Sequence, residues 1–154
     1  MILGSMPSQK SLQEKQYYAH PRNSFWWIMS QLFDFDLSIS YLERCLALQN
    51  AGVAVWDVLH DCQRKGSLDS AIVKSSEQSN DFDLLLTRYP SISTVIFNGA
   101  AAETIFVRHN KKLIQHIKQA RTDFHWYRCP STSPAHASLS KHDKLRAWRL
   151  RLED

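Results

Sequence analysis

The fold is decided by the stretch Gly4-Ser5-Met6-Pro7-Ser8 together with Gln16-Tyr17-Tyr18-Ala19-His20-Pro21-Arg22-Asn23-Ser24-Phe25-Trp26. A short apolar run at 1–3 enters a tight turn that contains Gly and Pro, and a long polar loop rich in aromatic residues follows. Loops that connect a strand to a helix are where α/β proteins place the groups that bind their ligands. The stretch therefore predicts a first strand that leads into a ligand-binding loop.

The side chains of this loop suit a planar, polar ligand. Tyr17, Tyr18 and His20 offer flat faces on which a heterocyclic base can stack. Gly4 allows the backbone to come close to a ligand, because it has no Cβ. Asn23 offers both a hydrogen-bond donor and an acceptor. Together these residues predict a pocket that holds a planar heterocycle.

Strand-like and helix-like segments alternate along the rest of the chain. Apolar and β-branched runs predict strands at 53–59, 94–97 and 124–128. Helical patterns occupy 24–33, 41–49, 81–89, 100–118 with a break near 109–110, and a final basic helix that ends at 152. Such alternation predicts an α/β fold with a roughly four-stranded parallel sheet and helices on both faces, a three-layer α/β/α sandwich.

Helix-capping residues support several of these boundaries. Ser40 with Glu43 forms a capping box, and Ser140 with Asp143 has the corresponding positions for the final helix. We expect Asn80 to cap the helix at 81–89.

Length and composition favour one globular domain, 1–154, that acts as a monomer. The chain has 154 residues, of which 44% are hydrophobic, and a formal charge of +4. That charge modestly favours a polyanionic partner. We find no apolar run long enough to cross a membrane and no export signal, so we expect a cytoplasmic protein, associated with a bacterial or archaeal nucleoid, or a nuclear one.

The cysteines give no sign of a metal site. Three of them lie far apart, and no Cys-x-x-Cys pair is present. This pattern makes a zinc or iron–sulfur site improbable and fits a reducing compartment. We expect no metal and no organic cofactor.

Four motifs, taken in order, resemble those of the uracil-DNA glycosylase superfamily and, within it, the hypoxanthine-DNA glycosylase (DNA-deoxyinosine glycosylase) branch. They are GSMPS at 4–8, YYAHPRNSFW at 17–26, VIFNG at 95–99 and STSPAHA at 131–137. Most of them follow the ends of predicted parallel strands, which share one edge of the sheet, so their loops are expected to meet.

This resemblance implies a monofunctional DNA glycosylase of base excision repair. Such an enzyme hydrolyses the N-glycosidic bond of deaminated bases in DNA, here hypoxanthine and, more weakly, uracil. Its partner is DNA that contains these bases. No lysine lies within a matching motif, so a Schiff-base intermediate is not expected.

The resemblance also assigns the catalytic role to Asn23. Many relatives carry an Asp or Asn between Ser5 and Pro7 that positions the attacking water, but here Met6 stands there. The Asn of the Pro-x-Asn-x-Phe-Trp segment matches Asn23 and takes over that role in this branch. The alternative is that Asn23 only caps the helix that follows it.

Four further positions are matched to binding of the extruded base. Tyr18 corresponds to an aromatic residue that stacks on the base, although simple core packing is the alternative. Asn98 is placed to read the edge of the base, or else it forms a turn with the glycine that follows. Gly4 and Ser5 complete the base-binding residues.

The motif at 131–137 is expected to contact DNA through Ser131, Ser133, Pro134 and His136, with a plain surface loop as the alternative. Ser131 stands where many relatives have His, and Ala135 where they have a bulky wedge residue.

Two other features were left open by the sequence. Asp57 either orients residues of the site without contacting the ligand itself or forms a salt bridge with a nearby basic residue. The basic residues of the final helix either follow phosphates or lie on a solvated face. They are Lys141, His142, Lys144, Arg146, Arg149 and Arg151.

Four other functions are alternatives to a hypoxanthine-DNA glycosylase. The first is a mismatch-specific uracil-DNA glycosylase that acts on G:T or G:U pairs, and the second is a non-catalytic nucleic-acid-binding relative in which Met6 marks lost activity. The other two are a serine hydrolase that uses Ser5 with His136 or His142, and a dehydrogenase. The last two lack their defining sequences, Gly-x-Ser-x-Gly and Gly-x-Gly-x-x-Gly.

Overall fold

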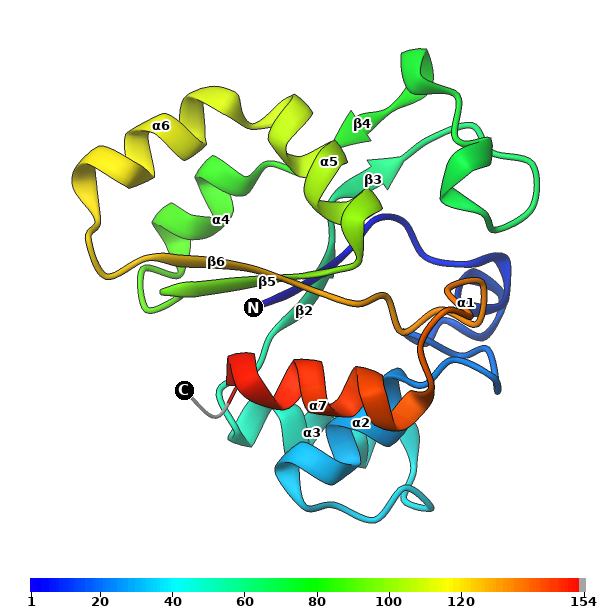
Figure 1. The fold of residues 1–154 in the computed structure, drawn as a ribbon. Helices are drawn as coiled ribbons and strands as arrows, with labels where there is room; N and C mark the ends of the chain where they lie inside the picture. The colour runs from blue at the N-terminus through cyan, green and yellow to red at the C-terminus, as the bar shows by residue number, and fades with distance from the viewer. Residues whose placement is uncertain (153–154) are drawn as a thin grey trace.

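Four parallel strands form the centre of the molecule in the computed structural model, which describes residues 1–152 (Figure 1). The strands are β1 (Ile2–Gly4), β2 (Val55–Asp57), β5 (Thr94–Asn98) and β6 (His125–Cys129). They lie in the order β2-β1-β5-β6, and every neighbouring pair is parallel. All four carboxyl ends therefore lie at one edge of the sheet.

Helices cover both faces of this sheet (Figure 1). One face carries α4 (Phe82–Arg88), α5 (Ala100–His109) and α6 (Lys111–Ala120), and the other carries α2 (Phe25–Phe33), α3 (Tyr41–Asn50) and α7 (Lys141–Leu152). The predicted three-layer α/β/α sandwich with a four-stranded parallel sheet is confirmed. No helix within residues 1–152 combines the length and the apolar character that crossing a membrane requires.

The alternation of side chains along the strands creates two separate cores. Leu3, Val95 and Phe97 point into the core beneath α5 and α6, whereas Ile2 and Ile96 point into the core beneath α2 and α7. All five are buried. Because both faces of the sheet are covered, its central strands β1 and β5 are almost continuous apolar runs.

The segment between β2 and α4 differs from the prediction. The expected strand 53–59 is wrong in its bounds, because the chain turns at Val58 and continues as a separate strand, β3 (Leu59–Asp61). β3 pairs antiparallel with β4 (Gln78–Ser79), which the sequence did not indicate. Two short 3₁₀ helices, η1 (Asp69–Ala71) and η2 (Lys74–Ser76), lie between these two strands.

One helix was not predicted, and one predicted helix cap is wrong. The loop after β1 contains an unexpected helix, α1 (Gln9–Glu14), which the Ser8 side chain caps by accepting a hydrogen bond from the backbone of Ser11. The predicted Asn80 cap of α4 is wrong, because the cap is Asp81, whose carboxylate accepts from the backbone of Leu84. The predicted break near 109–110 is confirmed, since α5 ends at His109 and α6 begins at Lys111.

Candidate active site

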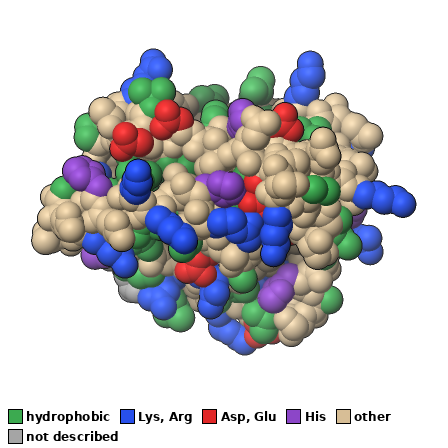
Figure 2. Space-filling view, turned by 90° about the horizontal axis from the view of Figure 1, so that it is seen from above, with side chains coloured by type: hydrophobic (Ala, Val, Ile, Leu, Met, Phe, Trp, Pro, Cys, Tyr) green, Lys and Arg blue, Asp and Glu red, His purple; other side chains and the backbone are tan. Residues whose placement is uncertain are grey.

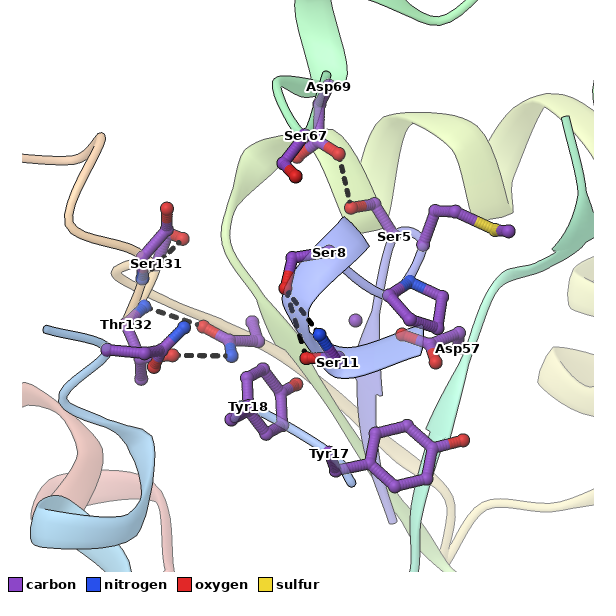
Figure 3. Close-up of a pocket in the computed structure, with 16 residues that line it drawn as sticks. Ser5, Ser8, Ser11, Tyr17, Tyr18, Asp57, Ser67, Asp69, Ser131 and Thr132 are labelled. Atoms are coloured by element: carbon purple, nitrogen blue, oxygen red, sulfur yellow. Dashed lines mark hydrogen bonds between the residues drawn. The ribbon is translucent and has the colours of Figure 1, made fainter. Parts of the chain in front are cut away.

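The carboxyl ends of three neighbouring strands place Asp57, Gly4 and Asn98 in one row. Gly4 pairs with Asp57 of β2, and the register of β1 with β5 sets Gly4 level with Asn98. These residues line a mostly polar cavity of about 90 Å³ (Figure 3). In this view Asp57 lies on one side of the cavity and Thr132 on the other. The middle position of the row has no side chain, so it forms a notch between a carboxyl group and an amide.

The glycine in the middle of the row is required by its neighbours. A Cβ at residue 4 would lie 2.5 Å from an oxygen of Asp57 and 3.2 Å from the hydroxyl of Tyr18. The close approach expected at Gly4 therefore occurs, but it is made by two side chains of the protein itself.

Asp57 is buried, with an exposed fraction of 6%. It makes no ion pair with any residue in 1–152, so the predicted alternative of a salt bridge is wrong. Burial raises the pKa of its carboxyl group to about 7, although a hydrogen-bonding contact with the Tyr17 side chain partly opposes this. A carboxyl group of this kind inside a cavity is typical of functional sites.

The two tyrosines reach the cavity from a segment held by α2 and α3. The indole of Trp26 donates to the carbonyl of Tyr17 at 2.8 Å, and the backbone of Tyr17 donates to the hydroxyl of Tyr41 at 3.0 Å. The ring of Tyr18 stacks on Phe25 at a centroid distance of 3.9 Å. One face of Tyr18 is therefore covered by core, and a base can stack only on its opposite face.

The Tyr18 hydroxyl is the one buried side-chain polar atom in residues 1–152 without a hydrogen-bond partner. It lies beside Gly4 and near Asp57. Burial, followed by the negative charge of Asp57, raises the pKa of Tyr18 well above its ordinary value, and the nearby Asn98 side chain opposes this only in part, so the phenol keeps its proton. A buried, unpaired hydroxyl costs free energy unless a ligand satisfies it.

Asn98 is buried and uses its amide to hold the loop across the cavity. Its Oδ1 accepts from the backbone of Thr132 at 2.8 Å, and its Nδ2 donates to the Thr132 hydroxyl at 2.9 Å. An amide has two donor hydrogens and two acceptor lone pairs, so one of each remains for a ligand. The geometry allows the predicted reading of a base edge, and it adds a structural role.

Asn23 both lines the cavity and caps α2. Its Oδ1 accepts from the backbone of Phe25 at 2.9 Å. Its Nδ2 makes no hydrogen bond with residues 1–152. The cap and the predicted contact with substrate are therefore compatible, because they use different atoms. His20 orders the same loop by accepting from the backbone of Arg22 at 3.2 Å.

One wall of the cavity comes from a segment that the sequence did not indicate. The hydroxyl of Ser5 donates to Asp69 at 2.6 Å, and Ser67 accepts from the backbone of Gln9 at 3.0 Å. The buried guanidinium of Arg64 donates to the carbonyl of Pro7. No histidine is among the residues that line the cavity, so the serine-hydrolase alternative built on Ser5 is wrong.

The loop at 131–137 contributes to the cavity with only its first residues. Ser131 and Ser133 line it together with Thr132, whereas Pro134 and His136 are exposed and lie outside it. A Cβ on Gly99 would lie 2.8 Å from the Cβ of Ser131, so this loop packs directly on the end of β5.

The final helix holds this loop in place. Lys144 is 4% exposed, and its ammonium group donates to the carbonyl of Ser133 at 3.1 Å. The indole of Trp148 donates to the carbonyl of Pro130 at 3.0 Å. Lys144 is therefore a structural anchor, and its suggested role in following phosphates is wrong.

The sequence profile of the uracil DNA glycosylase superfamily matches residues 1–152. The chain belongs to the uracil DNA glycosylase superfamily. Two curated relatives, from Methanosarcina barkeri and Methanosarcina acetivorans, carry the name hypoxanthine DNA glycosylase and are 38% identical over 100 residues and 35% identical over 103 residues. The matched regions cover 64% and 66% of this chain, and 62% and 64% of the respective relatives.

A solved structure supports the same family. The solution NMR structure of a candidate uracil DNA glycosylase from Methanosarcina acetivorans is similar to this chain with a TM-score of 0.74 and 28% identity. The matched region covers 99% of this chain and 89% of the chain in that structure. The resemblance based on the four motifs is confirmed at the level of the family.

Met6 stands where the resemblance led us to look for a residue that positions water. Its side chain packs against the core beneath α5 and α6 and contributes no hydrogen-bonding group to the cavity it borders. Polar side chains that line the cavity include those of Asn23, Asn98, Asp57 and the two tyrosines.

Proposed function

We propose that this protein is a monofunctional DNA glycosylase that removes hypoxanthine from DNA by hydrolysis, with uracil as a weaker substrate. The observation that carries the proposal is the meeting of Asn23 and Asn98 at one polar cavity, although they lie far apart in the sequence. The names of the two curated relatives support the choice of base. DNA is the partner, and the chain acts as a monomer in the compartment that contains the chromosome.

A glycosylase must extrude the base from the duplex, which costs a few kcal/mol of stacking and pairing. The free face of Tyr18 recovers part of this cost by stacking, at about 1–3 kcal/mol per base. The remaining donor and acceptor of Asn98 pair with O6 and N1–H of hypoxanthine. Adenine presents a donor where hypoxanthine has O6, so the buried amide would lose a partner at a cost of about 1–3 kcal/mol.

The bond from C1′ of the sugar to the base then breaks, and water adds to C1′. Charge builds up on both fragments in the transition state, and preorganised polar groups stabilise it. The Nδ2 of Asn23 is the group we assign to the water or sugar, because its Oδ1 is fixed by the cap and cannot turn away.

A panel of matched duplexes tests this function. Each contains one hypoxanthine, uracil or xanthine, and alkali cleaves the abasic site that base release leaves behind. We expect strand cleavage after alkali with hypoxanthine and none before alkali. Tight binding to these duplexes without cleavage would instead favour the non-catalytic relative, and release of uracil alone would favour the mismatch-specific enzyme.

A further inference from the structure

The row of residues at the ends of the strands suggests a second chemical group for the proposed reaction. Asp57 and Asn98 flank Gly4 on either side. Adjacent strands lie about 4.8 Å apart, so the backbones of the two outer residues are separated by roughly 10 Å. The Asp57 carboxyl and the Tyr18 hydroxyl come together over this notch, because a Cβ at residue 4 would lie 2.5 Å from the first and 3.2 Å from the second.

The chemistry on the two sides of this notch is different. Asn98 offers a neutral amide, whereas Asp57 offers a carboxyl group that no cation within residues 1–152 neutralises by an ion pair. Between them lies the Tyr18 hydroxyl, which is buried and unpaired. A ligand with several ring nitrogens and oxygens satisfies all three groups at once.

We propose that Asp57 is a general acid that hydrogen-bonds the extruded purine and donates its proton to N7 as the base departs. This proposal rests on the proposed glycosylase function. The C1′–N9 bond breaks, and its electron pair moves into the purine, which leaves as neutral hypoxanthine because it has gained the proton at N7. Water adds to C1′ and releases a proton to solvent, from which the Asp57 carboxylate later regains its own.

The surroundings of Asp57 favour the protonated form that an acid needs. Desolvation by burial raises its pKa to about 7. The negative charge of Asp69 acts in the same direction, while the side chain of Tyr17 and the charge of Arg64 act against it. Tyr18 faces it as well and remains a neutral phenol. An acid works best when its pKa lies near the working pH.

A pH profile tests the assignment. Single-turnover release of hypoxanthine by the wild-type protein is expected to be constant below about pH 6 and to fall about tenfold per pH unit well above pH 7. Asp57→Asn is expected to lower the rate at pH 6 by at least about 100-fold and to abolish the dependence on pH in this interval. Asp69→Asn is the matched control, because it removes a carboxylate from the wall of the same cavity; it should retain the fall in rate, moved to lower pH because the charge of Asp69 no longer raises the pKa of Asp57.

A change in the substrate tests the same step without any mutation. A duplex that contains 7-deaza-2′-deoxyinosine lacks the nitrogen that accepts the proton. The wild-type protein should release this base at least about 100-fold more slowly, and Asp57→Asn should cause no further loss. Binding to a duplex with non-hydrolysable 2′-fluoro-2′-deoxyinosine shows that the variant still takes up the lesion.

The outcomes separate this inference from the proposed function. Release of hypoxanthine at a rate that is independent of pH and unaffected by 7-deaza substitution would overturn the role of Asp57 alone. Failure of the wild-type protein to release hypoxanthine at any pH would overturn the proposed function, and the assignment of Asp57 with it.

Discussion

A carboxyl oxygen of Asp57 lies 2.5 Å from the point at which a Cβ on Gly4 would stand. Two real atoms of this kind cannot approach so closely, and the hydroxyl of Tyr18 is only 3.2 Å from the same point. The absence of a side chain at residue 4 thus allows two polar groups to meet over the end of β1. The shape of the cavity depends on this one position.

Gly4→Ala is therefore expected to impair both stability and activity. The new methyl group must displace Asp57 or Tyr18, and we expect a loss of about 1–3 kcal/mol in the free energy of unfolding, typical of overpacking. Base release should fall at least about tenfold. Gly52→Ala is a useful comparison for stability, because a Cβ there has nothing within 4 Å, although its positive φ of 72° adds backbone strain. Urea unfolding with equal midpoints for Gly4→Ala and wild type would contradict the close packing.

Asp57→Asn should stabilise the protein, and the gain should depend on pH. The folded state raises the pKa of Asp57 to about 7, whereas the unfolded chain has a pKa of about 4. Between these values the folded state binds more protons, so wild-type stability falls as pH rises from about 4 to 7. The variant escapes this loss, and we expect it to be more stable by about 2–4 kcal/mol at pH 8 and almost unchanged at pH 4.

Thermal unfolding of both proteins at pH 4, 6 and 8 measures this difference. A variant that is equally or less stable than the wild type at pH 8 would show that Asp57 is ionised and well stabilised in the folded protein. Buried ionisable groups at active sites commonly lower the stability of the folded protein.

Affinity for undamaged duplex DNA is expected to fall steeply as salt rises, because contacts with phosphates release counterions. Arg22 is exposed and adjoins Asn23, which lines the cavity, so Arg22→Ala should reduce the slope of log K against log salt by about one. Lys112→Ala removes the same charge from α6. Figure 2 looks onto the face that carries α6 and shows many Lys and Arg side chains there.

Because Lys112 lies on α6 and adjoins no residue that lines the cavity, its variant should keep nearly the wild-type slope. Fluorescence anisotropy between low and physiological salt gives both slopes. A wild-type affinity that does not change with salt would contradict the proposed phosphate contacts. Equal changes of slope in the two variants would show that DNA does not bind preferentially beside Asn23.

Hypoxanthine should be released faster than uracil from otherwise identical duplexes, by at least about tenfold. Ser5 and Ser8 line the cavity with small side chains, which leave space for the second ring of a purine. Single-turnover rates at saturating protein make the comparison. A higher rate on uracil would assign the protein to the mismatch-specific enzymes, in which Asn98 would keep its role.

Much of the fold could be predicted because its signals are local. The strand at Thr94–Asn98 is almost wholly buried and is a continuous apolar run, and the more exposed strand at His125–Cys129 is framed by turns and helices. The ends of these strands also hold the motifs, so the convergence at one edge followed from parallel topology.

Other parts of the site depend on contacts that local sequence does not contain. From the sequence, Asp57 could equally orient the site or form a salt bridge, and only the register with β1 places it over Gly4. Asp69 joins the cavity only because it accepts a hydrogen bond from Ser5, 64 positions away. The six residues of α1 are too few for a helical period to be recognised, although the cap at Ser8 is a signal that could have revealed it.

The central claim is that Asn23 performs chemistry in this cavity and does more than cap α2. Its most direct test is single-turnover release of hypoxanthine by Asn23→Ala and Asn23→Asp, with the wild type as reference. Aspartate can still accept from the backbone of Phe25, so Asn23→Asp keeps the cap but loses the amide hydrogens that face the cavity. We predict that both variants lose at least about tenfold in rate, equal to roughly 1.4 kcal/mol of barrier, while Asn23→Asp unfolds at nearly the wild-type temperature. Wild-type rates in a folded Asn23→Ala protein would contradict the account and leave Asn23 as a helix cap alone.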